Sequence, residues 1–141
     1  KQWLLSHPEI KDASVAEQYA LVHEGGGIVI QAHPFREAPY IPEIRLFPEY
    51  VDGVEGVNAT HSGTIATSRC MGHPEFNDRA IAYAKEHNLA LTAGSDQHST
   101  EMVYGGMVFD RKLENSHDFI KAVLEKEAVC LLDGTYNPFE K

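Results

Sequence analysis

The sequence predicts a mixed α/β fold built on a parallel sheet, arranged as an α/β barrel or an open α/β sheet. Short apolar runs rich in β-branched residues alternate with stretches of helical spacing along the chain. The links from helix to strand are short, whereas the links from strand to helix are long. An apolar fraction of 43% across 141 residues suits one globular domain with a core of its own.

Three helices are expected from capping signals and helical periodicity. Ser14 and Glu17 form a capping box, and the glycines at 25–27 end that helix because glycine accepts the left-handed cap conformation. A second helix is expected over about 77–87, and a third after Asn115 or Ser116. The apolar faces comprise Val15, Tyr19 and Val22 in the first helix, Phe76, Ala80, Tyr83, Ala84 and His87 in the second, and Phe119, Ile120, Val123 and Leu124 in the third.

Five short apolar runs predict buried strands, at 28–32, 53–57, 89–93, 107–109 and 128–132. Long links follow three of these strands, at about 34–50, 58–76 and 97–104. In parallel α/β folds, such links leave the carboxyl ends of the strands and carry the functional residues. We therefore expect a functional site at the carboxyl ends of the strands.

The charge and the cysteines limit the class of protein. The chain carries 21 acidic and 12 basic residues, a formal net charge of −9. This charge disfavours nonspecific binding to duplex DNA, but it is compatible with a small phosphate ester held by metal ions. No apolar run approaches the ~20 residues of a membrane helix, so we expect no membrane partner. Cys70 and Cys130 form no CxxC motif, and we interpret them as free thiols of a reducing, cytoplasmic compartment.

Two strand ends carry candidate metal ligands. His33 directly follows the strand at 28–32, and Pro34 turns the chain away after it. Asp96 and His98 follow the strand at 89–93, and if that strand continues through GSDQH, its alternation places both side chains on one face. Because Gly94 has no side chain, it then allows other groups to approach the backbone closely at the mouth of the site. An imidazole, a carboxylate and a second imidazole form a ligand set that suits Zn²⁺, Mn²⁺ or Fe²⁺.

Other polar residues near these strand ends have several interpretations. Glu55, within the strand at 53–57, is a ligand, a support for the ligands, a partner of Arg36, or the mark of an exposed edge. His61, in the long link that follows, is a further candidate to face the site. Ser95 is an unsuitable nucleophile, because neighbouring strand residues point to opposite faces. A lone Asp-x-His is a weak signal, and other histidines fit packing or solvated positions: His7, His23, His73, His87 and His117.

Four stretches taken together, in their order and spacing, resemble the C-terminal half of the PHP (polymerase and histidinol phosphatase) superfamily. They are IVIQAHPFR, VDGVEGVN, FNDRAIAYAKEHNLALTAGSDQH and YGGMVF, and the resemblance covers about residues 14–132. His33 matches the metal-binding histidine of the family's third motif, and Asp96 and His98 match the Asp-x-His of its fourth. The resemblance implies that residues 1–141 form one partial domain, the C-terminal half of a distorted seven-stranded barrel.

The resemblance also implies a reaction, the hydrolysis of phosphate esters by divalent metal ions at the carboxyl ends of the strands. Zn, Mn or Fe is the expected metal, with Mg as an alternative. Asp96 and His98 are then the catalytic residues, and His33, Asp96 and His98 are the metal ligands, with both imidazoles neutral. From its position in the loop, Arg36 is expected to contact the substrate phosphate. The expected substrate is a small phosphate ester, a nucleotide or a short oligonucleotide.

The chain departs from the family pattern in one respect: the HxH of the family's first motif is absent. We therefore expect this chain to be the C-terminal half of a longer protein. Three ligands suffice for one ion but not for a cluster of three, so the isolated chain is expected to hydrolyse phosphate esters poorly. An open sheet edge and inner face would be covered by self-association or by the N-terminal half.

Two competing interpretations stay open. One is a metal-dependent amidohydrolase, which shares the barrel and a late barrel aspartate, although the order of AHPF and GSDQH favours the PHP pattern. The other is a non-catalytic PHP-like module that keeps the fold for protein association.

Overall fold

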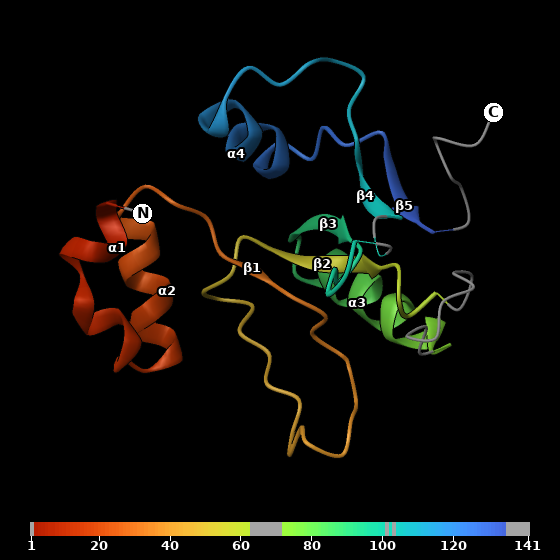
Figure 1. Cartoon of the computed structure of the whole chain (residues 1–141), viewed down its shortest axis with the longest axis horizontal. Helices are drawn as coiled ribbons and strands as arrows, with labels where there is room; N and C mark the ends of the chain where they lie inside the picture. Colours follow the sequence, from red (N-terminus) through yellow and green to blue (C-terminus); the bar gives the residue numbers. More distant parts are fainter. Residues whose placement is uncertain (1, 63–71, 101, 103, 135–141) are drawn as a thin grey trace.

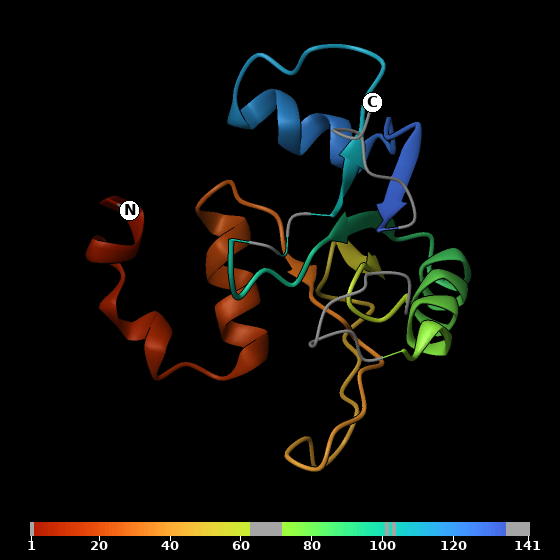
Figure 2. The ribbon, with the colours of Figure 1, turned by 45° about the vertical axis from the view of Figure 1, so that its right-hand side comes forward.

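The molecule is organised around a parallel sheet of three strands with helix α3 packed against it (Figures 1 and 2). The computed structural model describes residues 2–62, 72–100, 102 and 104–134. In chain order the elements are α1 (Gln2–Ser6), η1 (Pro8–Lys11), α2 (Val15–Glu24), β1 (Ile30–Gln31), β2 (Gly53–Asn58), α3 (Pro74–Glu86), β3 (Ala90–Gly94), β4 (Gly105–Val108), α4 (Ser116–Leu124) and β5 (Cys130–Asp133).

The three-stranded sheet has the order β1-β2-β3, and both of its strand pairs are parallel. Its strands coincide with the first three predicted runs, so the α/β class and the parallel sheet are confirmed. A closed barrel is not formed by the residues that the structure describes, and the partial barrel stays a prediction. Because the strands are parallel, the links after β1, β2 and β3 all begin at the same edge of the sheet.

The last two strands differ from the prediction, because β4 and β5 form an antiparallel pair. The alternation of strands and helices predicted parallel strands throughout, and this was wrong here. The connection over 109–129 contains α4 together with an irregular segment on each side, which gives the chain room to return in the opposite direction. Element order alone therefore does not fix the direction of this pair.

Helix ends follow the capping signals in the sequence. Ser14 and Glu17 make the reciprocal bonds of a capping box at α2, and after the helix Gly26 adopts a left-handed φ of 74°. Asn115 caps α4 by accepting hydrogen bonds from the backbone N–H groups of His117 and Asp118. Helix α3 begins at Pro74, slightly earlier than predicted, because proline suits the first helical position. The short elements α1 and η1 were not predicted.

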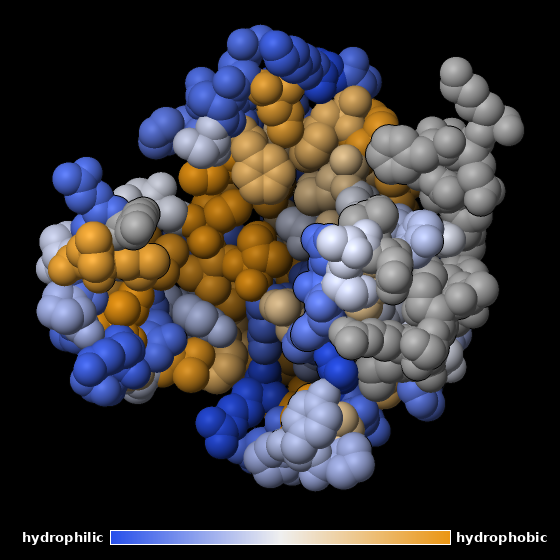
Figure 3. All heavy atoms as spheres, viewed as in Figure 1, coloured by the Kyte–Doolittle hydropathy of each residue, from blue (hydrophilic) through white to orange (hydrophobic). Residues whose placement is uncertain are grey.

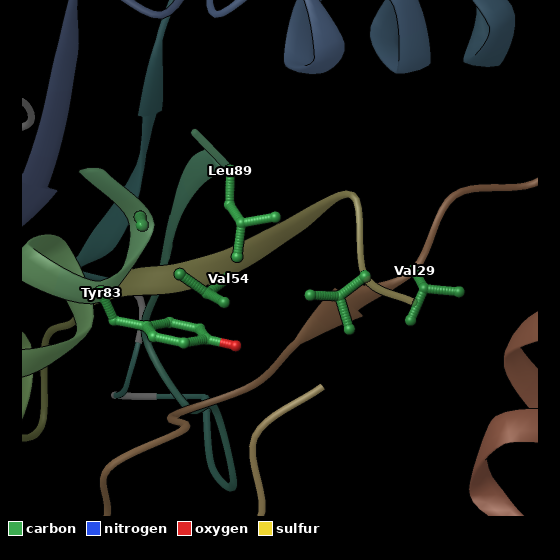
Figure 4. Packing of buried hydrophobic residues seen from close by; sticks show 6 residues of the cluster. Val29, Val54, Tyr83 and Leu89 are labelled. Carbon is green, nitrogen blue, oxygen red and sulfur yellow. The ribbon is translucent and has the colours of Figure 1, made fainter. Parts of the chain in front are cut away.

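The main apolar core lies between the sheet and α3. Val54 of β2 is completely buried, and Figure 4 shows it close to Tyr83 of α3 and Leu89, with Val29 from the segment before β1. This core packs the amino-terminal part of the sheet against α3 and leaves the carboxyl edge for polar residues. No helix in the described ranges is long and apolar enough to cross a membrane.

Candidate metal and phosphate site

Two candidate ligands occupy turns at corresponding places after parallel strands. His33 lies two residues past the end of β1, and Asp96 lies two residues past the end of β3. Both have left-handed backbone conformations, with φ of 30° at His33 and 49° at Asp96. For residues other than glycine such conformations cost roughly 1–3 kcal/mol, and they gather at functional sites. The surrounding structure therefore holds both residues in place against this cost.

The turn at Asp96 corrects one step of the sequence analysis. Strand β3 ends at Gly94, so the strand does not continue through GSDQH and its alternation does not align Asp96 with His98. The turn brings the two residues together instead. His98 Nδ1 lies 2.6 Å from the backbone carbonyl oxygen of Asp96 and 3.7 Å from Asp96 Oδ1.

The tautomer of His98 follows from that contact. A carbonyl oxygen accepts only, so His98 Nδ1 carries the proton and donates it to the backbone of Asp96. In the neutral imidazole, Nε2 is then the nitrogen with the free lone pair. The side chain is 63% exposed, so this nitrogen is accessible to an ion or a substrate.

Arg36 pairs with Asp96. Arg36 Nη1 lies 3.0 Å from Asp96 Oδ2, and the two side chains are only 20% and 16% exposed. The alternative pairing of Arg36 with Glu55 is not among the described contacts, although the sequence left it open. This ion pair joins the turn after β1 to the turn after β3 and places a guanidinium group beside the candidate ligands.

Glu55 holds the turn that carries His33. Its Oε2 accepts hydrogen bonds from the backbone N–H of His33 at 2.9 Å and from Asn58 Nδ2 at 3.2 Å. Burial raises the pKa of Glu55, while these hydrogen bonds act in the opposite direction. Gly94 provides the room for this carboxylate, because a Cβ there would lie 2.9 Å from Glu55 Oε1. The close approach expected at Gly94 is thus present, and the group that lies close to its backbone is the Glu55 carboxylate.

A β-bulge lets Glu55 and Asn58 face the same side. Between Glu55 and Val57 the register of β2 against β3 shifts, so Gly56 is an extra residue in β2. Residues three apart then share a face, instead of residues two apart. This bulge was not predicted, although a glycine inside a strand is a known signal for one.

Asn77 is a supporting residue that the sequence analysis missed. Its side-chain Oδ1 accepts from the Asn58 N–H at 3.0 Å, and its Nδ2 donates to the Asn58 carbonyl at 3.1 Å. Both partners are buried, so the pair fixes the end of β2 against α3. The available signal was a polar residue in register with Ala80 and Ala84 on the buried face of α3.

His61 is buried beside His33. It is 1% exposed, and its ring centroid lies 6.3 Å from that of His33 and 5.3 Å from that of Phe76. Burial, followed by the electrostatic effects of the neighbouring Arg36 and His33, lowers the pKa of His61 to about 4, while a hydrogen bond with Asn77 acts in the opposite direction. At neutral pH the ring is uncharged, and its Nε2 is buried without a hydrogen-bond partner among the described residues.

Ser95 has a structural role. Its Oγ accepts the Gly105 N–H at 2.7 Å and donates to the Gly105 carbonyl at 3.1 Å. The hydroxyl therefore joins β3 to β4, and its proton is directed to a carbonyl rather than to a histidine. This arrangement agrees with the rejection of Ser95 as a nucleophile.

The site thus gathers some of the predicted residues more closely than others. His33, Glu55, His61, Arg36 and Asp96 interact through hydrogen bonds, ring contacts or charge, and His98 lies at the exposed rim. Across the parts of the chain that the structure describes, no three His, Cys, Asp or Glu side chains lie close enough to hold an ion. The ligand set of His33, Asp96 and His98 therefore stays a prediction. Of the two cysteines, Cys130 is free and exposed, and Cys70 lies outside the described residues.

Residues 74–128 match a family model described as PHP-associated. The matched segment runs from α3 to just before β5 and includes Asp96 and His98, whereas His33 precedes it. The resemblance to the C-terminal part of a PHP-type domain is confirmed by this match. Searches of curated proteins and of solved structures found no match.

Proposed function

We propose that this chain supplies part of the active site of a metal-dependent phosphoesterase. The observation that carries the proposal is the ion pair of Arg36 with Asp96, which joins the turn of His33 after β1 to the turn of Asp96 after β3, with both candidate ligands in left-handed conformations. The match of residues 74–128 to the PHP-associated family model supports the same function. The proposed substrate is a small phosphate ester, a nucleotide or a short oligonucleotide.

The donor chemistry fits a divalent ion such as Zn²⁺, Mn²⁺, Fe²⁺ or Mg²⁺. The hydrogen bond at His98 Nδ1 leaves its Nε2 as a lone-pair nitrogen, and the buried His61 Nε2 is unpartnered within the described residues. His33, Asp96 and His98 would hold the ion, with Asp96 Oδ1 as the oxygen that Arg36 does not use. An ion held by these residues would supply Lewis-acid polarisation of the phosphoryl group and would lower the pKa of a water bound to it.

Arg36 binds the substrate phosphate in this proposal. A guanidinium group presents paired N–H donors that match two phosphate oxygens, and it stays charged at all relevant pH values. In the free protein, Arg36 pairs with Asp96 through one of its nitrogens, Nη1, and this contact orients the side chain toward the site. The strong cation also favours an anionic phosphate ester over the neutral amide of an amidohydrolase.

Glu55 and His61 hold the candidate ligand His33 in position. Glu55 fixes the turn of His33 through the backbone N–H, and His61 packs an uncharged ring beside that of His33. These contacts fix the direction of the His33 imidazole before an ion or a substrate arrives.

The test of this function is hydrolysis of a panel of phosphate esters with added Mn²⁺ or Zn²⁺. Turnover by the 141-residue chain is expected to be slow, because three ligands hold a single ion. Arg36→Lys is expected to lower kcat/KM by about tenfold or more, because lysine lacks the paired donors. Arg45→Lys is the matched control, since Arg45 is exposed and bonds only to Glu43 and Gln31 among the described contacts. Hydrolysis that is unchanged in Asp96→Asn would contradict the proposal.

A second candidate function is a non-catalytic association module. Several large apolar side chains are exposed, and Figure 3 shows apolar atoms on the surface between the N-terminal helices and α4. The exposed apolar side chains of the N-terminal helix α1, of α4 and of the segment after α4 include Leu4, Leu5, Phe119, Leu124 and Val129. Self-association, or association with an N-terminal half, is the proposed means of covering them. If the chain sediments as a monomer at micromolar concentration and still has a high melting temperature, the result would count against this candidate.

A further inference from the structure

A long loop leaves the candidate site and projects from the body of the molecule. This loop, residues 36–50, connects the turn after β1 to β2, and Figures 1 and 2 show it extending away from the sheet. Tyr40 lies within it and is 70% exposed, one of the most exposed large apolar residues that the structure describes. Nothing in the proposed hydrolysis explains an aromatic ring at this place.

Arg36 connects Tyr40 with the site. Its guanidinium carbon lies 5.9 Å from the centroid of the Tyr40 ring, within the range of a cation–π contact. Its Nη1 lies 3.0 Å from Asp96 Oδ2. One side chain therefore contacts both the ring in the loop and the carboxylate of the site. A phosphate bound by Arg36 would lie next to Asp96, and the rest of the same molecule could extend toward Tyr40.

The loop that carries Tyr40 is held at its base by contacts on both sides. Glu37 forms an ion pair with Arg79 of α3 at 2.6 Å, and Arg79 lies over the ring of Phe35 at 4.8 Å. At the other side, Gln31 Nε2 donates to the carbonyl of Arg45 at 2.6 Å. These contacts restrict the loop before a ligand binds, so the loop loses less conformational entropy on binding.

The segment around Tyr40 is restricted in its backbone conformation and borders a pocket. Pro39 precedes Tyr40 in the chain and Pro42 follows it by two residues, and the Ile41 N–H closes a turn on the Ala38 carbonyl at 2.9 Å. A pocket of about 390 Å³ lies beside this segment, lined by Arg36, Glu37, Ala38, Ile41, Pro42, Glu43 and Ile44. Its two carboxylates are paired, Glu37 with Arg79 and Glu43 with Arg45, so Arg36 and the apolar side chains are left to receive an anion joined to a flat ring.

We propose that Tyr40 is a specificity-determining residue that selects phosphate esters carrying a flat unsaturated ring, as in a nucleoside monophosphate. The ring of the ligand stacks on Tyr40 and its phosphate binds Arg36. The ligand therefore binds both side chains of the Arg36–Tyr40 contact. Stacking on an aromatic side chain accepts any base, since every base has a π face. This inference rests on the proposed function, because it takes the phosphate to be bound at the same site.

The experiment is calorimetric titration of the 141-residue chain with adenosine monophosphate and with ribose 5-phosphate, in the presence of Mn²⁺. The two probes share the sugar and the phosphate and differ in the base. The wild-type chain is expected to bind adenosine monophosphate about tenfold more tightly. Tyr40→Ala is expected to abolish this difference by weakening only adenosine monophosphate, whereas Tyr40→Phe keeps it. Tyr50→Ala is the control, because Tyr50 is a 44% exposed aromatic at the far end of the same loop.

Each other outcome has a defined meaning. Equal binding of both probes by the wild-type chain overturns this inference and leaves the proposed function standing. Equal weakening of both probes by Tyr40→Ala assigns Tyr40 a structural role in the loop and also overturns the inference. Binding of neither probe contradicts the proposed function and, with it, the role of Tyr40.

Discussion

At the scale of single residues, the two candidate ligands His33 and Asp96 lie in left-handed turns after β1 and β3. The placement of His33, Asp96 and His98 after apolar runs follows from the sequence alone. The left-handed turns at His33 and Asp96 do not, because they depend on hydrogen bonds from distant residues such as Glu55. The pairing of Arg36 with Asp96 joins residues far apart in the chain, and no local pattern indicates it.

Gly94 provides a residue-scale test of this geometry. In Gly94→Ala, the new Cβ would lie 2.9 Å from Glu55 Oε1 and displace the carboxylate from the His33 N–H. We expect the free energy of unfolding to fall by about 1 kcal/mol, because a hydrogen bond to a charged acceptor is weakened. We also expect the affinity for Mn²⁺ to fall by about tenfold, because a group that orients a ligand is moved. Chemical denaturation and calorimetry measure the two effects.

Gly106→Ala is the matched control. Gly106 is another strand glycine, but a Cβ there would meet no atom within 4 Å. The substitution is expected to leave metal affinity unchanged and to raise stability by up to about 1 kcal/mol, because alanine loses less conformational freedom than glycine on folding. Equal losses of metal affinity in the two variants would disprove the role assigned to Gly94.

At the scale of elements, periodicity and caps predicted the helices better than element order predicted the strands. The capping residues Ser14 and Asn115 are local signals, and both cap the helices that they precede. The parallel pairing of β1, β2 and β3 was predicted from alternation and is confirmed. The antiparallel pairing of β4 with β5 was not, because the path of a long connection depends on tertiary contacts.

The start of α4 is tied to its end by a cluster of charges that makes stability depend on pH. Arg111 donates to both carboxylate oxygens of Asp118 at 2.8 Å and to Glu127 Oε2 at 2.8 Å. The hydrogen bonds from Arg111 lower the pKa of Asp118 from its usual 3.8 to about 2. Because the pKa is lower in the folded state, the stabilisation is fully present above about pH 4 and is lost as the pH falls through about 2.

Asp118→Asn tests this cluster. The variant is expected to melt at a lower temperature than the wild-type chain at pH 6, and the difference should shrink as the pH falls from 5 to 2. Thermal unfolding followed by circular dichroism measures it. Asp110→Asn is the control, because Asp110 is exposed in the same link and makes no ion pair among the described contacts. A difference between Asp118→Asn and the wild type that is constant across this pH range would contradict the assigned pairing.

At the scale of the whole molecule, the core and the site occupy different parts of one sheet. Val54, Tyr83 and Leu89 pack the sheet against α3, and this packing leaves the carboxyl edge to His33, Glu55, Asp96 and Arg36. The α/β class and the parallel sheet were predictable from the sequence, and parallel strands end at a common edge, where the candidate site lies. The partial barrel stays a prediction, because its closure depends on strands beyond the three in this sheet.

The most direct test of the account is metal binding by the 141-residue chain, measured by calorimetry and by elemental analysis with Mn²⁺ and Zn²⁺. We expect one ion per chain, and at least a tenfold loss of affinity in the His33→Ala/Asp96→Ala double variant. His23→Ala is the control, because His23 pairs with Asp52 before the start of β2, at the opposite end of the sheet. Equal metal affinity in the double variant and the wild-type chain would contradict the central claim that the two strand ends form one site.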